Sequence, residues 1–210
     1  MSPEPEVAEH FANAQVQRNA VRLGMWAFLG TEILLFAGLF AGYAEYRSLY
    51  PEAFFYCSRH LDATLAMIET AVLITGSFAV VLAHHYAGER RGGLTSLSLL
   101  AAVATGGAFL ALHGVEYVTH FHEGALPGRY YTLAEIPIAG SSMFFTLYFL
   151  MTGLHSLHVI AGAGVLAWLA LRAARGPITE HKYNAVELGG LYWHLVDLIW
   201  IFLFPLLYLI

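Results

Sequence analysis

The chain has 210 residues, of which 58% are hydrophobic and 12% are charged, and its formal net charge is −5 at pH 7. Soluble domains carry about 25% charged residues, so the composition excludes an ordinary soluble domain and predicts a membrane protein. The small acidic charge gives no support for a nucleic-acid partner. The single cysteine, Cys57, excludes an internal disulfide or a cysteine metal cluster.

The N-terminal segment, residues 1–20, is polar and partly acidic. It lacks the basic start and apolar core of a signal peptide, so we expect a cytoplasmic tail and a first span that acts as its own insertion signal. Five later segments meet the need for about 20 largely apolar residues to cross the hydrocarbon core. These predicted spans are residues 21–46, 62–87, 94–118, 140–172 and 188–210. The sequence therefore predicts an all-α, polytopic membrane helix bundle in one transmembrane domain, residues 1–210.

The orientation of the bundle is predicted from Lys and Arg, which are enriched in cytoplasmic loops. Most of these residues fall on the side of the N-terminus. That side holds Arg18, Arg22, Arg90, Arg91, Arg172, Arg175 and Lys182, and the other side holds Arg47, Arg59 and Arg129. We therefore expect the N-terminus in the cytoplasm and the C-terminus outside.

Ionisable side chains lie inside the predicted spans, where each costs about 2.5–3.5 kcal/mol on insertion scales and normally has a partner and a role. They include Glu32, Glu69, His113, Glu116, His155, His158, His194 and Asp197. At a rise of about 1.5 Å per residue, those of the first, fourth and fifth spans reach similar depths, whereas Glu69 and Glu116 lie toward the outside. This placement predicts a hydrogen-bonded belt inside the bundle.

Two interpretations of these groups remain open on the sequence alone. Histidines and carboxylates that pair across helices can simply fix the packing of a bundle. The His-x-x-His pair His155 and His158, with nearby acids, could instead bind zinc or iron. The pair shares one helix face and cannot ligate opposite sides of one haem. Because no ligand set is complete, we expect no metal and no haem in this chain.

Glu32 and a double histidine carry the possible proton chemistry. Glu32 is surrounded by Leu, Ile and Phe, which favours its protonated form. A proton relay and a neutral carboxyl bonded to a neighbouring helix both fit this position. His84 and His85, at the cytoplasmic end of the second span, could collect protons at the surface or could simply be solvated.

Several stretches together resemble subunit III of the haem-copper respiratory oxidases. They are RLGMWAFLGTEILLF (22–36), VVLAHHYAGER (80–90), VEY (115–117), GLHSLHVIAG (153–162) and YWHLVDLIWIFLFPLLY (192–208). The resemblance implies the five-helix form found in many bacterial cytochrome c and quinol oxidases, in the cytoplasmic (inner) membrane. It also implies a non-catalytic subunit without haem or copper of its own. Those cofactors are expected in the partner subunits.

The family's residue roles are carried over by this resemblance. Glu32 matches an intramembrane carboxylate that reacts with hydrophobic carbodiimide, and Arg22 matches an arginine beside bound phospholipid. The structural motif residues are His155, His158, His194 and Asp197. The family's subunit packs against subunit I, binds lipids and sustains proton uptake during respiration.

The chain also departs from the family pattern. Glu69 stands where many members have Asn, His113 where Gln is usual and Ser156 where Gly is common, and the 119–139 loop is longer than typical. The electron donor, cytochrome c or quinol, therefore stays open, as does a nitric-oxide-reductase accessory role. A small transporter or proton channel and a membrane metalloenzyme are the alternatives outside the family.

The pair His194 and Asp197 lies three residues apart in the last span. We expect it to hold that span against the fourth and first spans, which makes its role architectural rather than catalytic.

Overall fold

The computed structural model describes residues 11–209, and those residues form helices joined by short loops, with no β-strand among them. The long helices are α1 (Ala14–Leu49), α3 (Ala63–Gly88), α4 (Gly92–Glu123), α5 (Ser141–Ala174) and α6 (Glu180–Tyr208). Two short elements, α2 (Pro51–His60) and the 3-10 helix η1 (Gly128–Tyr130), lie in connections between them.

The five long helices confirm the predicted all-α membrane bundle, since each is long and apolar enough to cross a membrane. Helix α1 begins at Ala14, so the second part of the predicted 1–20 tail is helical, and residues 1–10 lie outside the described part of the chain. Side-chain caps are present at several helix starts. At the start of α3, for example, Asp62 accepts hydrogen bonds from the backbone of Thr64 and Leu65.

Helix α2 is an element that hydropathy did not predict. Its sequence nevertheless carries a helix start, with Pro51 in the first turn beside the acidic Glu52. The helix packs its inner face into the bundle end, where Phe54 and Cys57 are fully buried. Burial raises the pKa of the Cys57 thiol, which keeps this side chain protonated as a packing group.

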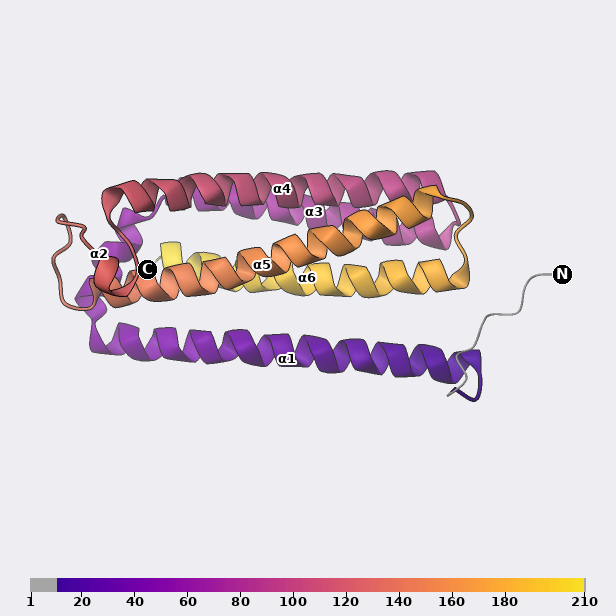
Figure 1. Ribbon diagram of the computed structural model, residues 1–210, viewed down its shortest axis with the longest axis horizontal. Helices are drawn as coiled ribbons and strands as arrows, with labels where there is room; N and C mark the ends of the chain where they lie inside the picture. Colours follow the sequence, from indigo (N-terminus) through magenta and orange to yellow (C-terminus); the bar gives the residue numbers. More distant parts are fainter. Residues whose placement is uncertain (1–10, 210) are drawn as a thin grey trace.

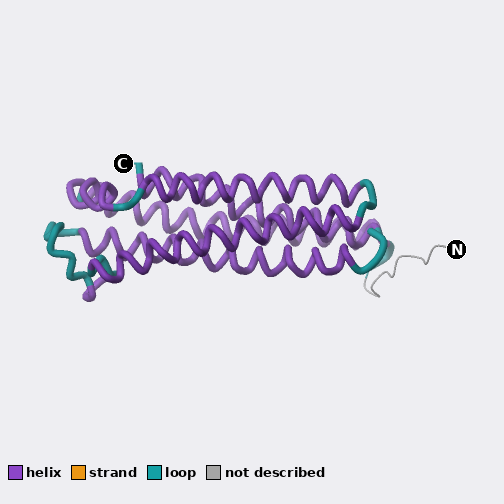
Figure 2. The backbone as a smooth tube through the Cα atoms, turned by 90° about the horizontal axis from the view of Figure 1, so that it is seen from above, coloured by secondary structure: helices purple, strands orange, loops and turns teal. Residues whose placement is uncertain are grey.

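The helices run side by side along the long axis of the molecule (Figures 1 and 2). Helices α3 to α6 form the compact part, and α1 lies along one side of it (Figure 1). Only Leu29, Phe36 and Tyr43 of α1 are fully buried, one every seven residues, so α1 touches the bundle along a narrow stripe. Most of its surface therefore faces the surroundings of the bundle.

The core is organised around Trp193, a fully buried side chain of α6. Glycines on three other helices make room for its ring. A Cβ at Gly106 of α4 would lie 2.7 Å from the ring, one at Gly162 of α5 would lie 3.1 Å away, and one at Gly76 of α3 would lie 3.7 Å away. The four helices can approach closely because these positions carry no side chain.

We predict that Gly106→Ala destabilises the bundle, because the new methyl group collides with Trp193, and overpacking typically costs about 1–3 kcal/mol. Gly107→Ala is the matched control, since nothing lies within 4 Å of its added Cβ. The control should gain up to about 1 kcal/mol of helix propensity. Thermal unfolding in mild detergent measures both, and a Gly106→Ala protein as stable as Gly107→Ala would contradict the packing argument.

Candidate functional site

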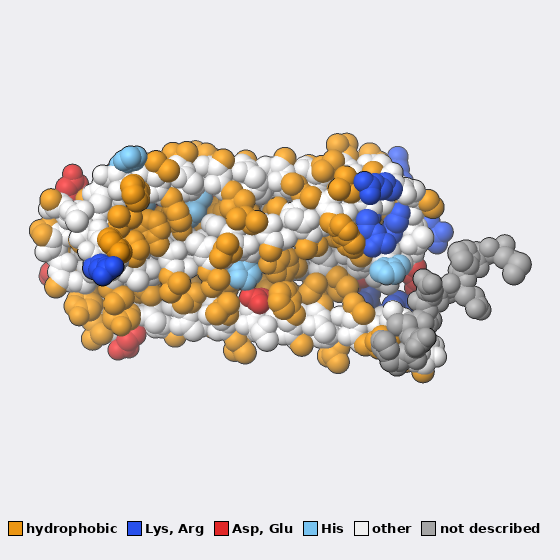
Figure 3. Space-filling model, viewed as in Figure 1, with side chains coloured by type: hydrophobic (Ala, Val, Ile, Leu, Met, Phe, Trp, Pro, Cys, Tyr) orange, Lys and Arg blue, Asp and Glu red, His pale blue; other side chains and the backbone are white. Residues whose placement is uncertain are grey.

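Glu32 of α1 and His158 of α5 form a direct pair in the middle of the bundle. Glu32 Oε2 lies 2.8 Å from His158 Nε2, and the two side chains are 15% and 14% exposed. Figure 3 shows an acidic and a histidine side chain together, midway along an otherwise largely hydrophobic face. This contact is the cross-helix partner that an intramembrane carboxyl requires.

The contact of His158 Nδ1 determines which proton positions are open to the Glu32–His158 pair. His158 Nδ1 lies 2.8 Å from the Leu154 carbonyl oxygen, which can only accept, so Nδ1 carries a proton. The proton between Glu32 and Nε2 then sits either on the carboxyl, giving a neutral pair, or on the imidazole, giving an ion pair. The geometry therefore defines one shared proton site between α1 and α5.

His194 takes a partner that the sequence analysis did not foresee. Its Nδ1 lies 2.6 Å from Ser77 Oγ of α3. The expectation that His194 holds the last span against the fourth and first spans is therefore wrong for this residue. Asp197, three residues further along α6, is buried, and neither of its carboxyl oxygens has a hydrogen-bond partner in the described part of the chain.

His155, the other histidine of the His-x-x-His motif, is fully buried but takes part in no polar pair among the described residues. Its ring stacks on Trp200 at 5.2 Å and meets the edge of Phe109 at 5.5 Å, and its ring nitrogens have no hydrogen-bond partner within residues 11–209. His155 and His158 thus contact different neighbours. The predicted belt is divided into separate contacts rather than one network.

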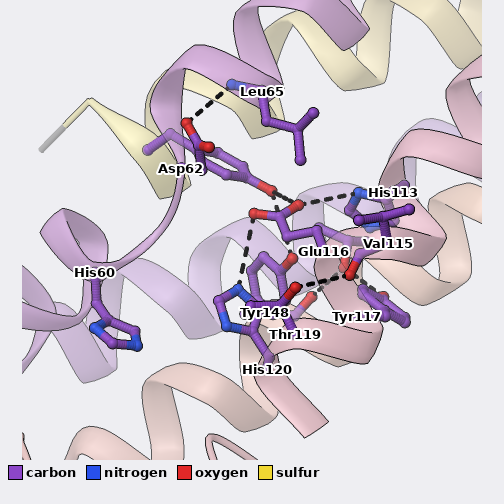
Figure 4. Close-up of polar contacts among 12 residues, drawn as sticks. His60, Asp62, Leu65, His113, Val115, Glu116, Tyr117, Thr119, His120 and Tyr148 are labelled. Atoms are coloured by element: carbon purple, nitrogen blue, oxygen red, sulfur yellow. Dashed lines mark hydrogen bonds and ion pairs between the residues drawn. The ribbon is translucent and has the colours of Figure 1, made fainter. Parts of the chain in front are cut away.

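A second polar cluster fills the bundle near the end that carries α2 (Figure 4). His113 Nδ1 of α4 lies 3.5 Å from Glu69 Oε1 of α3 and 3.4 Å from Glu116 Oε2. The Tyr208 hydroxyl of α6 donates to Glu116 Oε2 at 2.8 Å. All of these side chains are buried, so the cluster links three helices without contact with solvent.

The cluster continues toward the end of the bundle. His120 Nε2 lies 3.8 Å from Glu116 Oε1, and His120 Nδ1 lies 3.3 Å from Glu123 Oε2. His60 Nε2 of α2 lies 3.1 Å from the same Glu123 oxygen. Among residues 11–209, two groups have ligand atoms within 4.8 Å of one another, close enough to hold a metal ion. They are Glu69, His113 and Glu116, and His60, His120 and Glu123.

Glu69, His113 and Glu116 are among the polar groups expected from the sequence, whereas His120 and Glu123 are not. The signal was present, because positions 113, 116, 120 and 123 recur at helical spacing and share one face of α4. His60 carried no such signal, since it lies on a separate short helix, 63 residues away from Glu123.

The end of the bundle near the start of α1 carries the predicted basic residues. Arg22 of α1 makes a two-pronged contact with Glu187 of α6 at 2.9 and 3.0 Å. Arg18 pairs with Glu180 at 2.9 Å. These residues line a groove of about 180 Å³ between α1 and α6.

His84 and His85 do not act as a pair at this end. The His84 ring packs at 5.0 Å from Tyr183 of α6, whereas His85 is 62% exposed and lies 3.4 Å from Glu89 on its own helix. Only His85 therefore presents its ring to the surface as a proton antenna would.

Fold and site together define a multi-pass helical membrane protein whose polar groups tie helices to one another. The chain matches the family described as cytochrome c oxidase subunit III over residues 5–210, and it belongs to this family. The match spans all five long helices.

Individual relatives carry the names of two kinds of oxidase. The chain is 29% identical to quinol oxidase subunit 3 of Bacillus subtilis over 194 residues, which cover 89% of this chain and 85% of the relative. It is 30% identical to cytochrome c oxidase subunit 3 of the same organism over 190 residues, or 89% and 84% of the two chains. Cytochrome c oxidase subunit 3 of Pelomedusa subrufa is 29% identical over 199 residues, which cover 91% of this chain and 70% of the relative.

We predict that Ser77→Ala lowers stability, because it leaves His194 Nδ1 without its partner, and interhelical hydrogen bonds in membranes contribute about 0.6 kcal/mol on average. Thr75→Ala is the matched control on the same helix, since the Thr75 hydroxyl is exposed and bonds only its own helix at the Ala71 carbonyl. Thermal unfolding of both variants in detergent provides the comparison. Equal stability of the two would show that the Ser77 contact contributes nothing.

Proposed function

We propose that this chain is the non-catalytic subunit III of a haem-copper terminal oxidase, the complex that passes electrons to oxygen in aerobic respiration. The observation that carries the proposal is the family match over residues 5–210, supported by relatives named as subunit 3 of quinol and cytochrome c oxidases. In this proposal haem and copper are held by partner subunits. Subunit I is the partner against which the bundle packs.

The arrangement of polar groups supports a structural rather than a redox role. Glu32 and His158 join α1 to α5, His194 and Ser77 join α6 to α3, and Tyr208 joins α6 to Glu116 of α4. Each contact fixes one pair of helices inside the bundle. Such cross-links suit a rigid body on which a larger membrane subunit docks.

Phospholipid is the second proposed partner, at the groove between α1 and α6. Arg22 uses one terminal nitrogen for Glu187 and is 54% exposed, so other guanidinium N–H donors remain for a phosphate group. The narrow contact stripe of α1 also leaves apolar surface beside the groove for acyl chains. We place this end at the cytoplasmic face of a bacterial inner membrane, on the Lys and Arg count.

The shared proton between Glu32 and His158 suggests how the subunit supports proton uptake. The pair is partly exposed within an apolar stretch, and its hydrogen bond has one proton position on the carboxyl and one on the imidazole. We propose that this site exchanges protons with the catalytic subunit or with the lipid interface, and that electrons do not pass through it.

The assembly proposal is tested by affinity purification of the tagged chain in mild detergent from its native membranes. We expect haem absorbance and oxygen-reducing activity to co-purify with the chain. An equally tagged, unrelated membrane protein from the same membranes is the control. Purification of the chain in an intact, soluble form with no haem above this control would contradict the proposal.

Glu32→Gln tests the proton role separately. Because His158 Nδ1 carries a proton, Nε2 can accept from the Gln amide, so the helix contact survives while proton exchange is lost. We expect a fully assembled complex whose oxygen reduction starts at close to the wild-type rate but whose proton uptake or lifetime in turnover decreases. Oxygen consumption and proton release are measured together.

The control for this substitution is Glu135→Gln, which changes an exposed loop carboxyl. Immediate and complete loss of oxygen reduction in Glu32→Gln, with haem content intact, would make Glu32 an obligatory proton carrier. Turnover and proton uptake equal to those of Glu135→Gln would instead make the pair a packing contact.

A further inference from the structure

We propose that the α2 end of the bundle is a binding site for a divalent transition-metal ion of the zinc class, held by His60, His120 and Glu123. The three side chains come from the last turn of α2 and the last two turns of α4. This site goes beyond the proposed oxidase role. It also departs from the sequence-based expectation that the chain binds no metal.

The spacing of the ligand atoms fits a zinc ion. Glu123 Oε2 lies 3.1 Å from His60 Nε2 and 3.3 Å from His120 Nδ1, and the three ligand atoms all lie within 4.8 Å of one another. Zinc binds imidazole nitrogen and carboxylate oxygen at about 2.0–2.2 Å, which places neighbouring ligand atoms of a tetrahedral site about 3.3 Å apart. The two histidine nitrogens lie within 4.8 Å of each other, so closing that separation to about 3.3 Å completes the tetrahedral geometry.

The type of ligand selects the class of metal. Two imidazoles and one carboxylate suit zinc and its transition-metal neighbours, whereas magnesium and calcium prefer oxygen ligands. Three protein ligands leave a fourth position for water. Glu123 is 38% exposed and His60 is 19% exposed, so an ion can reach the site from solution.

The surroundings of His120 provide a second and independent argument. With Nδ1 directed at Glu123, its Nε2 faces Glu116 Oε1 at 3.8 Å, and the His120 side chain is only 4% exposed. A histidine that binds a metal normally directs its other ring nitrogen at such a carboxylate, which fixes the tautomer and orients the ring. Glu116 is in turn held by the Tyr208 hydroxyl.

The charge balance of the cluster also favours a bound cation. Within residues 11–209, the ion-pair contacts of Glu69, Glu116 and Glu123 are all made with histidines and none with Lys or Arg. A divalent cation supplies the missing positive charge. It would also join α2 to α4 through His60, His120 and Glu123.

The test uses the full chain, purified in mild detergent with the subunits that accompany it, on an affinity tag without histidines. After removal of metal with a chelator, Zn²⁺ is titrated and zinc per chain is measured by elemental analysis. We expect one zinc ion per chain and a rise in the unfolding temperature. Zinc-edge X-ray absorption should show nitrogen and oxygen ligands, and haem iron does not contribute to this signal.

Single substitutions assign the site. His60→Ala and Glu123→Gln, both at accessible positions, should lower zinc affinity by about tenfold or more and abolish the thermal shift. His122→Ala is the matched control, because His122 lies in the same turn of α4 but is exposed and outside the triad. His122→Ala should bind zinc as the wild type does.

Two results would overturn the proposal. One is the absence of stoichiometric zinc in a folded wild-type protein. The other is zinc binding that survives in His60→Ala and Glu123→Gln, which would identify an adventitious surface ion. Because both variants leave the buried His120 in place, loss of folding does not obscure the outcome.

Discussion

Hydrocarbon offers no hydrogen-bond partner, and each ionisable side chain that enters it needs a partner from another helix or a site that uses its charge. In this bundle the requirement places the polar contacts between helices. Glu32 pairs with His158, Ser77 with His194, and Tyr208 with Glu116. The arrangement of the helices is therefore fixed by a few polar contacts as well as by the packing of Trp193 between glycines.

Helix α1 depends on these contacts more than the other helices do. Its buried stripe is narrow, and polar links add the Glu32–His158 pair in the middle and the Arg22–Glu187 and Arg18–Glu180 pairs near its start. The same geometry leaves apolar surface and a groove at the side of the bundle. A helix held in this way offers a place where lipid or a neighbouring subunit can fill the remaining space.

The buried groups at the α2 end form a run along one helix rather than single pairs between helices. There, histidines and carboxylates alternate along one face of α4 from His113 to Glu123, and the last member, Glu123, reaches the surface. A continuous run of such groups is expensive to bury for packing alone. A metal ion at its outer end would compensate part of the negative charge and secure the short helix α2.

The sequence by itself determined the five membrane-crossing helices and the family, because hydropathy over about 20 residues and the order of local motifs are properties of the chain alone. It also identified Glu32, Glu69, Glu116, His158 and His194 as intramembrane polar groups.

Only the tertiary structure decided which of these groups meet. The local pattern of the last span gave no reason to expect Ser77, 117 residues away, as the partner of His194. Nor could it bring His60 to Glu123, because α2 has too few apolar residues to register in a hydropathy window. The helical period assigns each side chain to a face of its own helix, whereas close packing at Gly76, Gly106 and Gly162 sets which faces touch.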